Sequence, residues 1–317
     1  MILSARVNTF GQDLLRRHGE RVHKIALDAG FTCPNRDGTK GRGGCSFCNN
    51  VSFSPDADTR LSLAAQIAKA RGAIAKRTRA RKFIAYFQAY TNTYAKVETL
   101  EALYREALKE PDMVGISVGT RPDCVSSDVL DLLDRFRDQG LEVCLELGLQ
   151  SAFDKSLERV NRGHTFAEYR TTLLAARQRG IPVCTHLIVG LPGESEVHCH
   201  ATLDIVLETG VDGLKLHPLH IVKHTLLAHQ WRKGEYAPLS KEQYIDMAAN
   251  LIERTPSNIV YHRVTATASR DVLLAPAWCA EKWNVLNGIE IELRRRGTRQ
   301  GSRAGIPFVS EELRHVA

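Results

Sequence analysis

The sequence predicts an α/β fold: a partial barrel of six βα units, open on one side, followed by a C-terminal α/β extension. Short β-branched runs alternate with segments whose apolar residues recur at helical spacing, which is typical of a parallel sheet covered by helices. Six such units are fewer than the eight of a closed barrel. After Pro238 the alternation stops, so we place the barrel core in residues 1–237 and the extension in residues 238–317.

Apolar runs bounded by turn or charged residues predict six strands. They span Val22–Leu27, Phe83–Phe87, Met113–Val118, Leu141–Leu147, Val183–Val189 and Gly213–Leu216. Helices are predicted between them at Leu61–Lys76, Leu100–Leu108, Asp128–Phe136, Phe166–Arg179 and Glu194–Glu208. Gly140 and Gly180 each follow a basic or polar turn and precede a strand, as expected where a helix ends.

The extension is predicted to contain a helix, a short strand and a long helix, at Lys241–Glu253, Ile259–His262 and Trp278–Arg296. A barrel of six units is open on one side, and such an opening admits a large substrate. We therefore expect the extension to cover the mouth of the barrel.

Composition indicates a globular protein: 43% of the 317 residues are hydrophobic, enough for a substantial core. The longest apolar stretches are short and interrupted by charge, and the N-terminus lacks the pattern of a secretory signal. We therefore expect a cytoplasmic protein with no membrane partner. Eight cysteines in that reducing compartment are available for metal ligation rather than for disulfides.

The net charge of +7 is matched by a single segment, residues 69–82, which holds seven Lys or Arg and no acid. Clustered cations favour a polyanionic partner such as RNA, because phosphate neutralisation with counterion release needs no sequence-specific contact. A solvated helix face would produce the same pattern.

Cys33, Cys45 and Cys48 follow the first predicted strand in a glycine-rich loop. Chemistry in βα barrels gathers at the C-terminal ends of the strands, and glycines let a loop approach a cofactor closely. Three thiolates on a [4Fe-4S] cluster leave one iron without a protein ligand. The amino and carboxylate groups of S-adenosylmethionine can occupy that iron, and reduction of the sulfonium then releases methionine and a 5′-deoxyadenosyl radical.

A zinc site that uses the same three cysteines and a histidine is the alternative, but structural zinc usually has a second close pair of ligands, and none is evident. The other five cysteines are isolated, and isolated cysteines are most often small buried apolar residues. Cys144 and Cys184 lie in predicted strands, which favours that interpretation. The roles of Cys124 and Cys279, beside prolines in predicted loops, stay open.

Distinctive segments occur in order along nearly the whole chain, among them Gly30-Phe-Thr-Cys-Pro-Asn-Arg, Tyr86-Phe-Gln-Ala-Tyr-Thr-Asn-Thr, Glu146-Leu-Gly-Leu-Gln-Ser, His186-Leu-Ile-Val-Gly-Leu-Pro-Gly-Glu and Lys215-Leu-His-Pro-Leu-His. They resemble radical SAM proteins of the YhcC/YtqA type, in the Elp3-like branch of that superfamily. The commonest cluster motif of the superfamily has a shorter gap between its first two cysteines than the eleven residues found here, but the YhcC type shares the long gap. The resemblance implies a partial (β/α)6 TIM-like barrel, a [4Fe-4S] cluster, S-adenosylmethionine and an electron donor such as flavodoxin or ferredoxin.

The resemblance also implies the residues that bind the cofactor S-adenosylmethionine: Phe47, Gln88, Thr91, Glu146, Gln150, Arg162 and His186. Phe47 corresponds to an aromatic residue near the adenine, and Gln150 corresponds to a ribose-binding position. Arg162 corresponds to an arginine that pairs with the methionine carboxylate, a task that suits its planar fork of donors. The alternatives are that Arg162 forms a surface ion pair and that His186 is a hydrogen-bonded core histidine.

Titratable side chains are densest at the end of the sixth predicted strand and in the loop after it. We name Lys215, His217 and His220 as candidate catalytic residues, because histidines move protons near neutral pH and a lysine can contact an anionic group. If the strand continues, Lys215 and His217 point the same way and Leu216 points to the other face. The alternative is that some of these side chains face the core and only one or two reach substrate.

The leading functional hypothesis is a radical SAM enzyme that modifies RNA, with tRNA as its partner, because the Elp3-like branch includes enzymes that act on wobble uridine. A second hypothesis is radical chemistry on a small-molecule or porphyrin-like substrate. A third is a non-enzymatic iron–sulfur sensor or scaffold protein. Kinship of fold does not choose among substrates.

Overall fold

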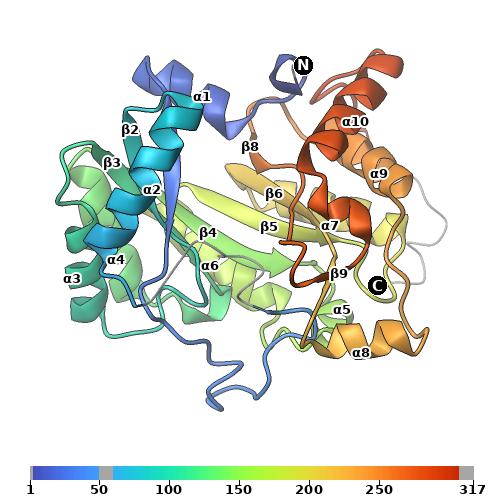
Figure 1. The fold of residues 1–317 in the computed structure, drawn as a ribbon, viewed down its shortest axis with the longest axis horizontal. Helices are drawn as coiled ribbons and strands as arrows, with labels where there is room; N and C mark the ends of the chain where they lie inside the picture. Colours follow the sequence, from blue (N-terminus) through green and yellow to red (C-terminus); the bar gives the residue numbers. More distant parts are fainter. Residues whose placement is uncertain (1–2, 50–59, 307–317) are drawn as a thin grey trace.

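The computed structural model describes residues 3–49 and 60–306. Seven parallel strands form a curved, half-barrel sheet in the order β1-β2-β3-β4-β5-β6-β8, with helices packed around its outer face (Figure 1). The strands of this sheet are β1 (Val22–Leu27), β2 (Lys82–Phe87), β3 (Met113–Thr120), β4 (Glu142–Gln150), β5 (Val183–Val189), β6 (Gly213–Pro218) and β8 (Val260–Arg263). A separate antiparallel ribbon pairs β7 (Ile221–Val222) with β9 (Leu273–Ala275).

Within residues 3–49 and 60–306, the α-helices match the predicted segments to within a few residues and include three that the sequence did not indicate. The predicted ones are α2 (Leu63–Thr78), α3 (Val97–Ala107), α4 (Ser127–Asp138), α6 (Phe166–Gln178), α7 (Glu196–Glu208), α9 (Lys241–Arg254) and α10 (Lys282–Arg295). The additional ones are α1 (Phe10–His18), α5 (Asp154–Arg159) and α8 (Leu226–Arg232). These three are short, so they offer little periodicity to a sequence analysis.

The partial barrel is confirmed, with one strand more than the six predicted. The strand that we expected in the extension, β8, pairs in parallel with β6 in the register Gly213↔Val260 and Leu214↔Tyr261. It therefore satisfies the backbone groups that β6 would otherwise expose at its edge. The division at residue 237 stays a prediction, and residues 307–317 of the predicted extension lie outside the described part of the chain.

Local sequence explains how individual helices begin and end. The Ser126 hydroxyl accepts a hydrogen bond from the Val129 N–H at 3.4 Å at the start of α4, and a capping box of Thr165 and Glu168 starts α6. Gly140 and Gly180 follow α4 and α6 with φ of +82° and +66°, which confirms the predicted ends.

Helix α1 joins the two edges of the sheet at the open side of the barrel. It contacts both β1 and β8, and the Tyr261 N–H donates a 2.8 Å hydrogen bond to the Asn8 carbonyl just before the helix. Among the described residues, no helix is both long and apolar enough to span a bilayer.

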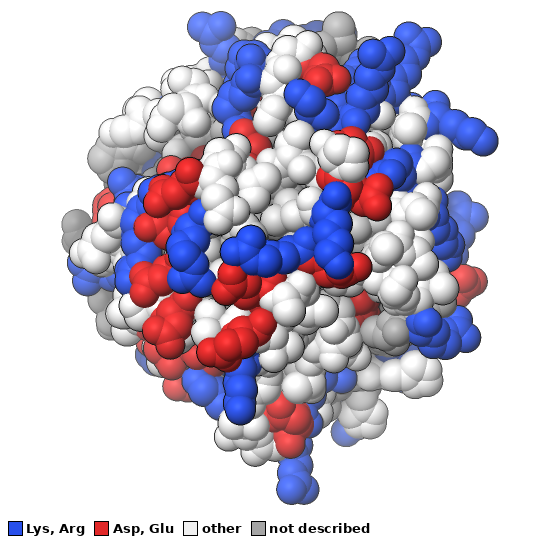
Figure 2. All heavy atoms as spheres, turned by 90° about the vertical axis from the view of Figure 1, so that its left-hand side faces the viewer, with Lys and Arg blue, Asp and Glu red and all other residues white. Residues whose placement is uncertain are grey.

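The basic segment 69–82 lies on α2 and the turn after it. Arg71 forms ion pairs with Glu110 and Asp112, and Lys82 pairs with Glu20. Figure 2 shows the face on the side of α2, α3 and α4, where acidic and basic side chains alternate across the middle and basic ones gather toward the upper edge. The ion pairs of Arg71 and Lys82 fit the solvated-face interpretation of this segment.

Candidate functional site

A cavity of about 180 Å³ lies at the C-terminal ends of the barrel strands. The three cysteines of the loop after β1 line it, together with most of the other residues that the sequence indicated: Phe47, Gln88, Thr91, Gln150, Arg162, His186, Lys215 and His217. Parallel strands bring these distant segments to one edge of the sheet. Two predicted site residues, Glu146 and His220, do not line the cavity, and their predicted roles stay predictions.

The cysteine loop is tied to its surroundings by backbone hydrogen bonds. The Ser46 N–H donates to the Val160 carbonyl at 2.9 Å, and the Leu227 N–H at the start of α8 donates to the Ser46 carbonyl at 2.8 Å. Figure 1 shows this loop at the bottom of the molecule, beside α5 and α8. Gly44 has a φ of +81°, and a Cβ there would lie 2.9 Å from Arg36 Nε. The tight turn before Cys45 therefore requires glycine.

Cationic and amide donors surround the thiols. Arg162 Nη1 lies 3.6 Å and Asn35 Nδ2 3.8 Å from Cys45 Sγ. Burial and Cys45 raise the pKa of the Cys48 thiol, whereas Arg36 and Arg162 act to lower it. Three thiols in one cavity beside two arginines form a donor set that fits an anionic thiolate-ligated cluster.

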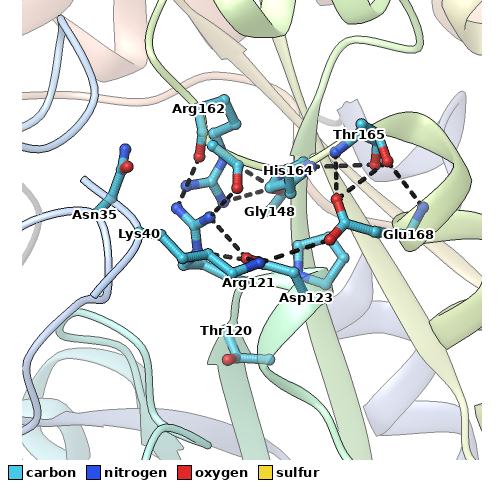
Figure 3. A network of polar contacts seen from close by, with 12 residues as sticks. Asn35, Lys40, Thr120, Arg121, Asp123, Gly148, Arg162, His164, Thr165 and Glu168 are labelled. Carbon is cyan, nitrogen blue, oxygen red and sulfur yellow. Dashed lines mark hydrogen bonds and ion pairs between the residues drawn. The ribbon is translucent and has the colours of Figure 1, made fainter. Parts of the chain in front are cut away.

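A buried network behind the cavity fixes the loop that carries Arg162 (Figure 3). Arg121, only 2% exposed, binds both carboxylate oxygens of Asp123 at 3.0 and 2.9 Å. It also donates to the carbonyls of Arg162 and Gly163 at 2.7 and 2.9 Å. The Arg162 guanidinium in turn donates to the Gly148 carbonyl at 2.6 and 3.2 Å. The position of Arg162 at the cavity is therefore set by β3 and β4.

Beneath the cavity, a layer of charged side chains fills the barrel axis, and we call it the floor. Its centre is Glu146 on β4, whose carboxylate binds the ammonium groups of Lys24 on β1 and Lys215 on β6. It also accepts hydrogen bonds from Ser117 at 2.7 Å and, at 2.8 Å, from His186 Nε2. Barrel interiors are usually filled by branched apolar residues, so this layer is unusual.

The floor residues hold perturbed pKa values because they are buried together. Burial alone would raise the pKa of Glu146, but Lys215 and Lys24 hold it well below its usual value. Burial, with help from Lys24 and Arg263, lowers the pKa of Lys215 to about 8 against the attraction of Glu146. The Lys215 ammonium also donates to the Tyr86 hydroxyl at 3.0 Å. At neutral pH Glu146 is therefore ionised, and Lys215 titrates close to that range.

Side chains of the kind that ligate metals also meet at the floor: Cys144, Glu146 and His262, and Glu146, Cys184 and His186, each have ligand atoms within 4.8 Å of one another. Two ammonium groups already occupy the carboxylate, so an ion-pair layer explains this cluster without a cation. A second cavity of about 350 Å³ lies below it, at the N-terminal ends of the strands.

We expect acid to destabilise the protein before its carboxylates titrate. Burial and Lys24 lower the pKa of His262 to about 3, and burial and Lys215 lower that of His186 to about 4. An unfolded histidine binds its proton near pH 6.5, so between about pH 6.5 and 4 the unfolded chain takes up protons that the folded chain does not. The free energy of unfolding should therefore fall across this window, by roughly a few kcal/mol per histidine.

Urea unfolding of the apoprotein at several pH values measures this dependence without interference from cluster loss. The variant His262→Gln should show a shallower dependence than the wild type. The exposed His229 on α8 provides the control, since His229→Gln should leave the dependence unchanged. Equal slopes in the His262 variant and the wild type would show that this histidine is not held neutral by burial.

Comparison with known proteins identifies the family. The model described as the radical SAM superfamily matches residues 35–206, over half of the chain, and a radical SAM C-terminal domain matches residues 211–295. The chain belongs to the radical SAM superfamily. Enzymes of this superfamily use a [4Fe-4S] cluster and S-adenosylmethionine, so these are its cofactors, and the zinc alternative is set aside.

Its relatives confirm the YhcC/YtqA type. The radical SAM chain is 51% identical to YhcC of Escherichia coli (strain K12) over 98% of its own length and 99% of YhcC, and 37% identical to YtqA of Bacillus subtilis (strain 168) over 93% and 92%. It is also 30% identical to a tRNA uridine(34) acetyltransferase of Dehalococcoides mccartyi (strain CBDB1), over 48% of this chain and 33% of that protein.

The fold agrees with a solved structure of this superfamily. The archaeal Elp3 of Methanocaldococcus infernus, solved without residues 1–46, superposes with a TM-score of 0.61 at 18% identity. The match covers 88% of this radical SAM chain and 64% of the Elp3 chain. At this identity the comparison establishes the shared barrel and C-terminal architecture.

Sequence reasoning missed the roles of two residues at the floor, Lys24 and Tyr86. No motif marks Lys24, whereas Tyr86 opens one of the distinctive segments, but that segment does not indicate its contact with Lys215. The alternation of side chains along a strand could have indicated Lys24. It is an isolated lysine in an apolar strand, and such a charge points either to solvent or to a buried partner.

Proposed function

We propose that this radical SAM enzyme modifies RNA and that tRNA is its substrate. The observation that carries the proposal is the convergence, in one cavity at the barrel mouth, of three cysteines, the predicted S-adenosylmethionine residues and the pair Lys215 and His217. The similarity to a tRNA uridine(34) acetyltransferase supports RNA over other substrate classes.

In this proposal Cys33, Cys45 and Cys48 hold the cluster, and Arg162 binds the methionine carboxylate. When bound, the cluster and S-adenosylmethionine together supply a 5′-deoxyadenosyl radical that abstracts hydrogen from the substrate. The protein contributes the placement of both molecules and the exclusion of side reactions.

Lys215 and His217 face the substrate end of the cavity from β6. Lys215 Nζ is oriented by Glu146 and the Tyr86 hydroxyl and can hold or release a proton near neutral pH. His217 is stacked on His186 with ring centroids 5.8 Å apart, and burial followed by Arg263 keeps its pKa well below the usual value. His217 is therefore neutral and can accept a hydrogen bond from the substrate.

The variant Arg162→Lys should bind S-adenosylmethionine roughly tenfold more weakly or worse, because a lysine cannot make the two parallel hydrogen bonds of a guanidinium. Equilibrium binding to the reconstituted protein measures this loss. Arg159→Lys is the matched control, since Arg159 lies three residues earlier and contacts the Pro192 carbonyl outside the cavity. Equal affinity in both variants would remove Arg162 from the cofactor site.

Nucleoside mass spectrometry of tRNA from a deletion strain tests the substrate. We expect one modified nucleoside to disappear and to return with the wild-type gene but not with Cys45→Ser. Unchanged tRNA in the deletion strain would contradict the proposal. If the reconstituted protein still releases 5′-deoxyadenosine in that case, a small-molecule substrate becomes the better hypothesis. If it releases none, a non-enzymatic scaffold becomes the better hypothesis.

The proposal includes a reduced flavodoxin or ferredoxin as electron donor, since radical SAM enzymes need a reductant. It places the enzyme in the cytoplasm, a compartment that suits the eight free cysteines of the structure. To test the donor, purified reduced flavodoxin is added to the enzyme, and reduction of the cluster is monitored by the visible absorbance of the cluster.

A further inference from the structure

A groove of about 650 Å³, larger than both cavities described above, adjoins the candidate active site. It is formed by the segment after β8 and the start of α10, and small side chains such as Ala266, Ala268 and Ser269 line part of it. Arg263 lines both this groove and the cysteine-lined cavity, so the two meet at that side chain. A ligand in the groove therefore lies next to the reaction site.

The groove carries cations that are not neutralised. Arg263, Arg270 and Lys282 line it, and within the described residues none of the three forms an ion pair or a side-chain hydrogen bond. Elsewhere many of the arginines are paired, as Arg71 is with Asp112. Unpaired cations gathered in one groove create a local positive potential that favours an anionic ligand.

The basic end of α2 belongs to the same region. Partial burial, Arg263 and Arg77 together lower the pKa of the Lys282 ammonium, which places these cations within electrostatic range of one another. Arg77 is exposed near the end of α2 and, like the groove cations, has no ion pair in the part of the chain that the structure describes. The unneutralised part of the basic segment therefore extends the positive surface of the groove.

An exposed aromatic side chain completes the groove. Trp283 is 65% exposed, the most exposed of the large hydrophobic side chains of the described residues, and the Lys282 ammonium lies 5.7 Å from its ring centroid. One acid is present, Glu281, which accepts a 2.8 Å hydrogen bond from Asn284. An exposed indole among cations is the combination that binds single-stranded nucleic acid, through stacking on bases and contacts to phosphates.

We propose that this groove binds the RNA strand adjacent to the nucleotide that is modified, with Arg263, Arg270 and Lys282 on its phosphates and Trp283 stacked on a base. The inference rests on the proposed RNA substrate and adds where and how the RNA docks. An acidic protein, such as an electron donor, would also be attracted by the cations, but it gives the exposed indole no base to stack on.

Binding of fluorescein-labelled tRNA to the reconstituted enzyme, followed by fluorescence anisotropy at several salt concentrations, tests the groove. The double variant Arg270→Glu/Lys282→Glu should bind tRNA at least about tenfold more weakly at low salt and should lower the slope of log Kd against log salt by about 1 to 2. Trp283→Ala should weaken binding about fivefold or more with an unchanged slope, because stacking releases no counterions.

Arg294→Glu is the matched control, since Arg294 is exposed on the same helix, twelve residues from Lys282, and should bind tRNA like the wild type. The visible absorbance of the cluster checks that each variant is folded. If the wild type binds tRNA and the groove variants match the control, the groove inference fails while the RNA substrate stands. A wild type that binds no tRNA at low salt overturns both, and variants impaired only in reduction by flavodoxin would assign the groove to a protein partner.

Discussion

Replacing Cys45 with serine is expected to abolish the iron–sulfur cluster and to reduce the release of 5′-deoxyadenosine to background. A serine hydroxyl is not deprotonated near neutral pH and is a poor ligand for the iron of a cluster that soft thiolates hold. Arg162 Nη1 lies 3.6 Å from Cys45 Sγ, so the loss of this thiol also removes a sulfur contact of that guanidinium. Iron and sulfide content, together with anaerobic cleavage assays under a chemical reductant, measure both effects.

Cys124→Ser provides the control for this variant and settles one of the roles that the sequence left open. Cys124 lies in the turn between β3 and α4 and does not line the cavity, and burial followed by Asp123 raises the pKa of its thiol to about 11. We expect the cluster and the cleavage activity to survive. A cluster that persists in Cys45→Ser, or disappears in Cys124→Ser, would contradict the assignment of the three ligands.

The variant Glu146→Leu should lower the free energy of unfolding by about 3–5 kcal/mol, because it leaves the ammonium groups of Lys24 and Lys215 buried without their counterion. Urea unfolding of the apoprotein measures the loss. Glu142→Leu on the same strand is the control: the Glu142 side chain is 27% exposed and pairs with Arg17 at the surface, so its loss should cost about 1 kcal/mol or less.

A triple variant separates loss of the ion pairs from loss of shape. Lys24→Met/Glu146→Leu/Lys215→Met removes all three charges and keeps side chains of similar length. Apolar replacement of a complete buried ion network is often neutral or stabilising, so this variant should recover most of the stability that Glu146→Leu loses. If Glu146→Leu is as stable as the wild type, the floor is not an ion-pair layer.

Those parts of the molecule that depend on local sequence could be predicted, and those that depend on distant pairing could not. The first six strands and their helices follow from alternation along the chain, and the cavity residues follow from their place after strand ends. The floor joins Lys24 and Glu146 across 122 residues, and no local pattern indicates that partnership. Similarly, β8 looked like part of an appendage because parallel pairing with β6 leaves no mark in its own sequence.

His220 and Glu146 show the same limit within the site. Both belong to segments that mark the family, yet neither lines the cavity: His220 is buried in the loop after β6, and Glu146 lies below the cavity. The position of a residue at a strand end predicts that it lies near the site. Packing decides where its side chain points and how deeply it is buried.

The charged floor also divides the cysteines of the barrel into two chemical environments. Cys144 and Cys184 precede Glu146 and His186 by two residues, so they lie on the same faces of β4 and β5, one layer nearer the N-terminal ends. Burial raises the pKa of Cys144 to about 11 and that of Cys184 well above its usual value, which keeps both as thiols. An S–H bond is weak and readily gives its hydrogen to a carbon radical. The floor therefore lies between these two S–H groups and the cavity in which a bound cluster and S-adenosylmethionine would supply a radical.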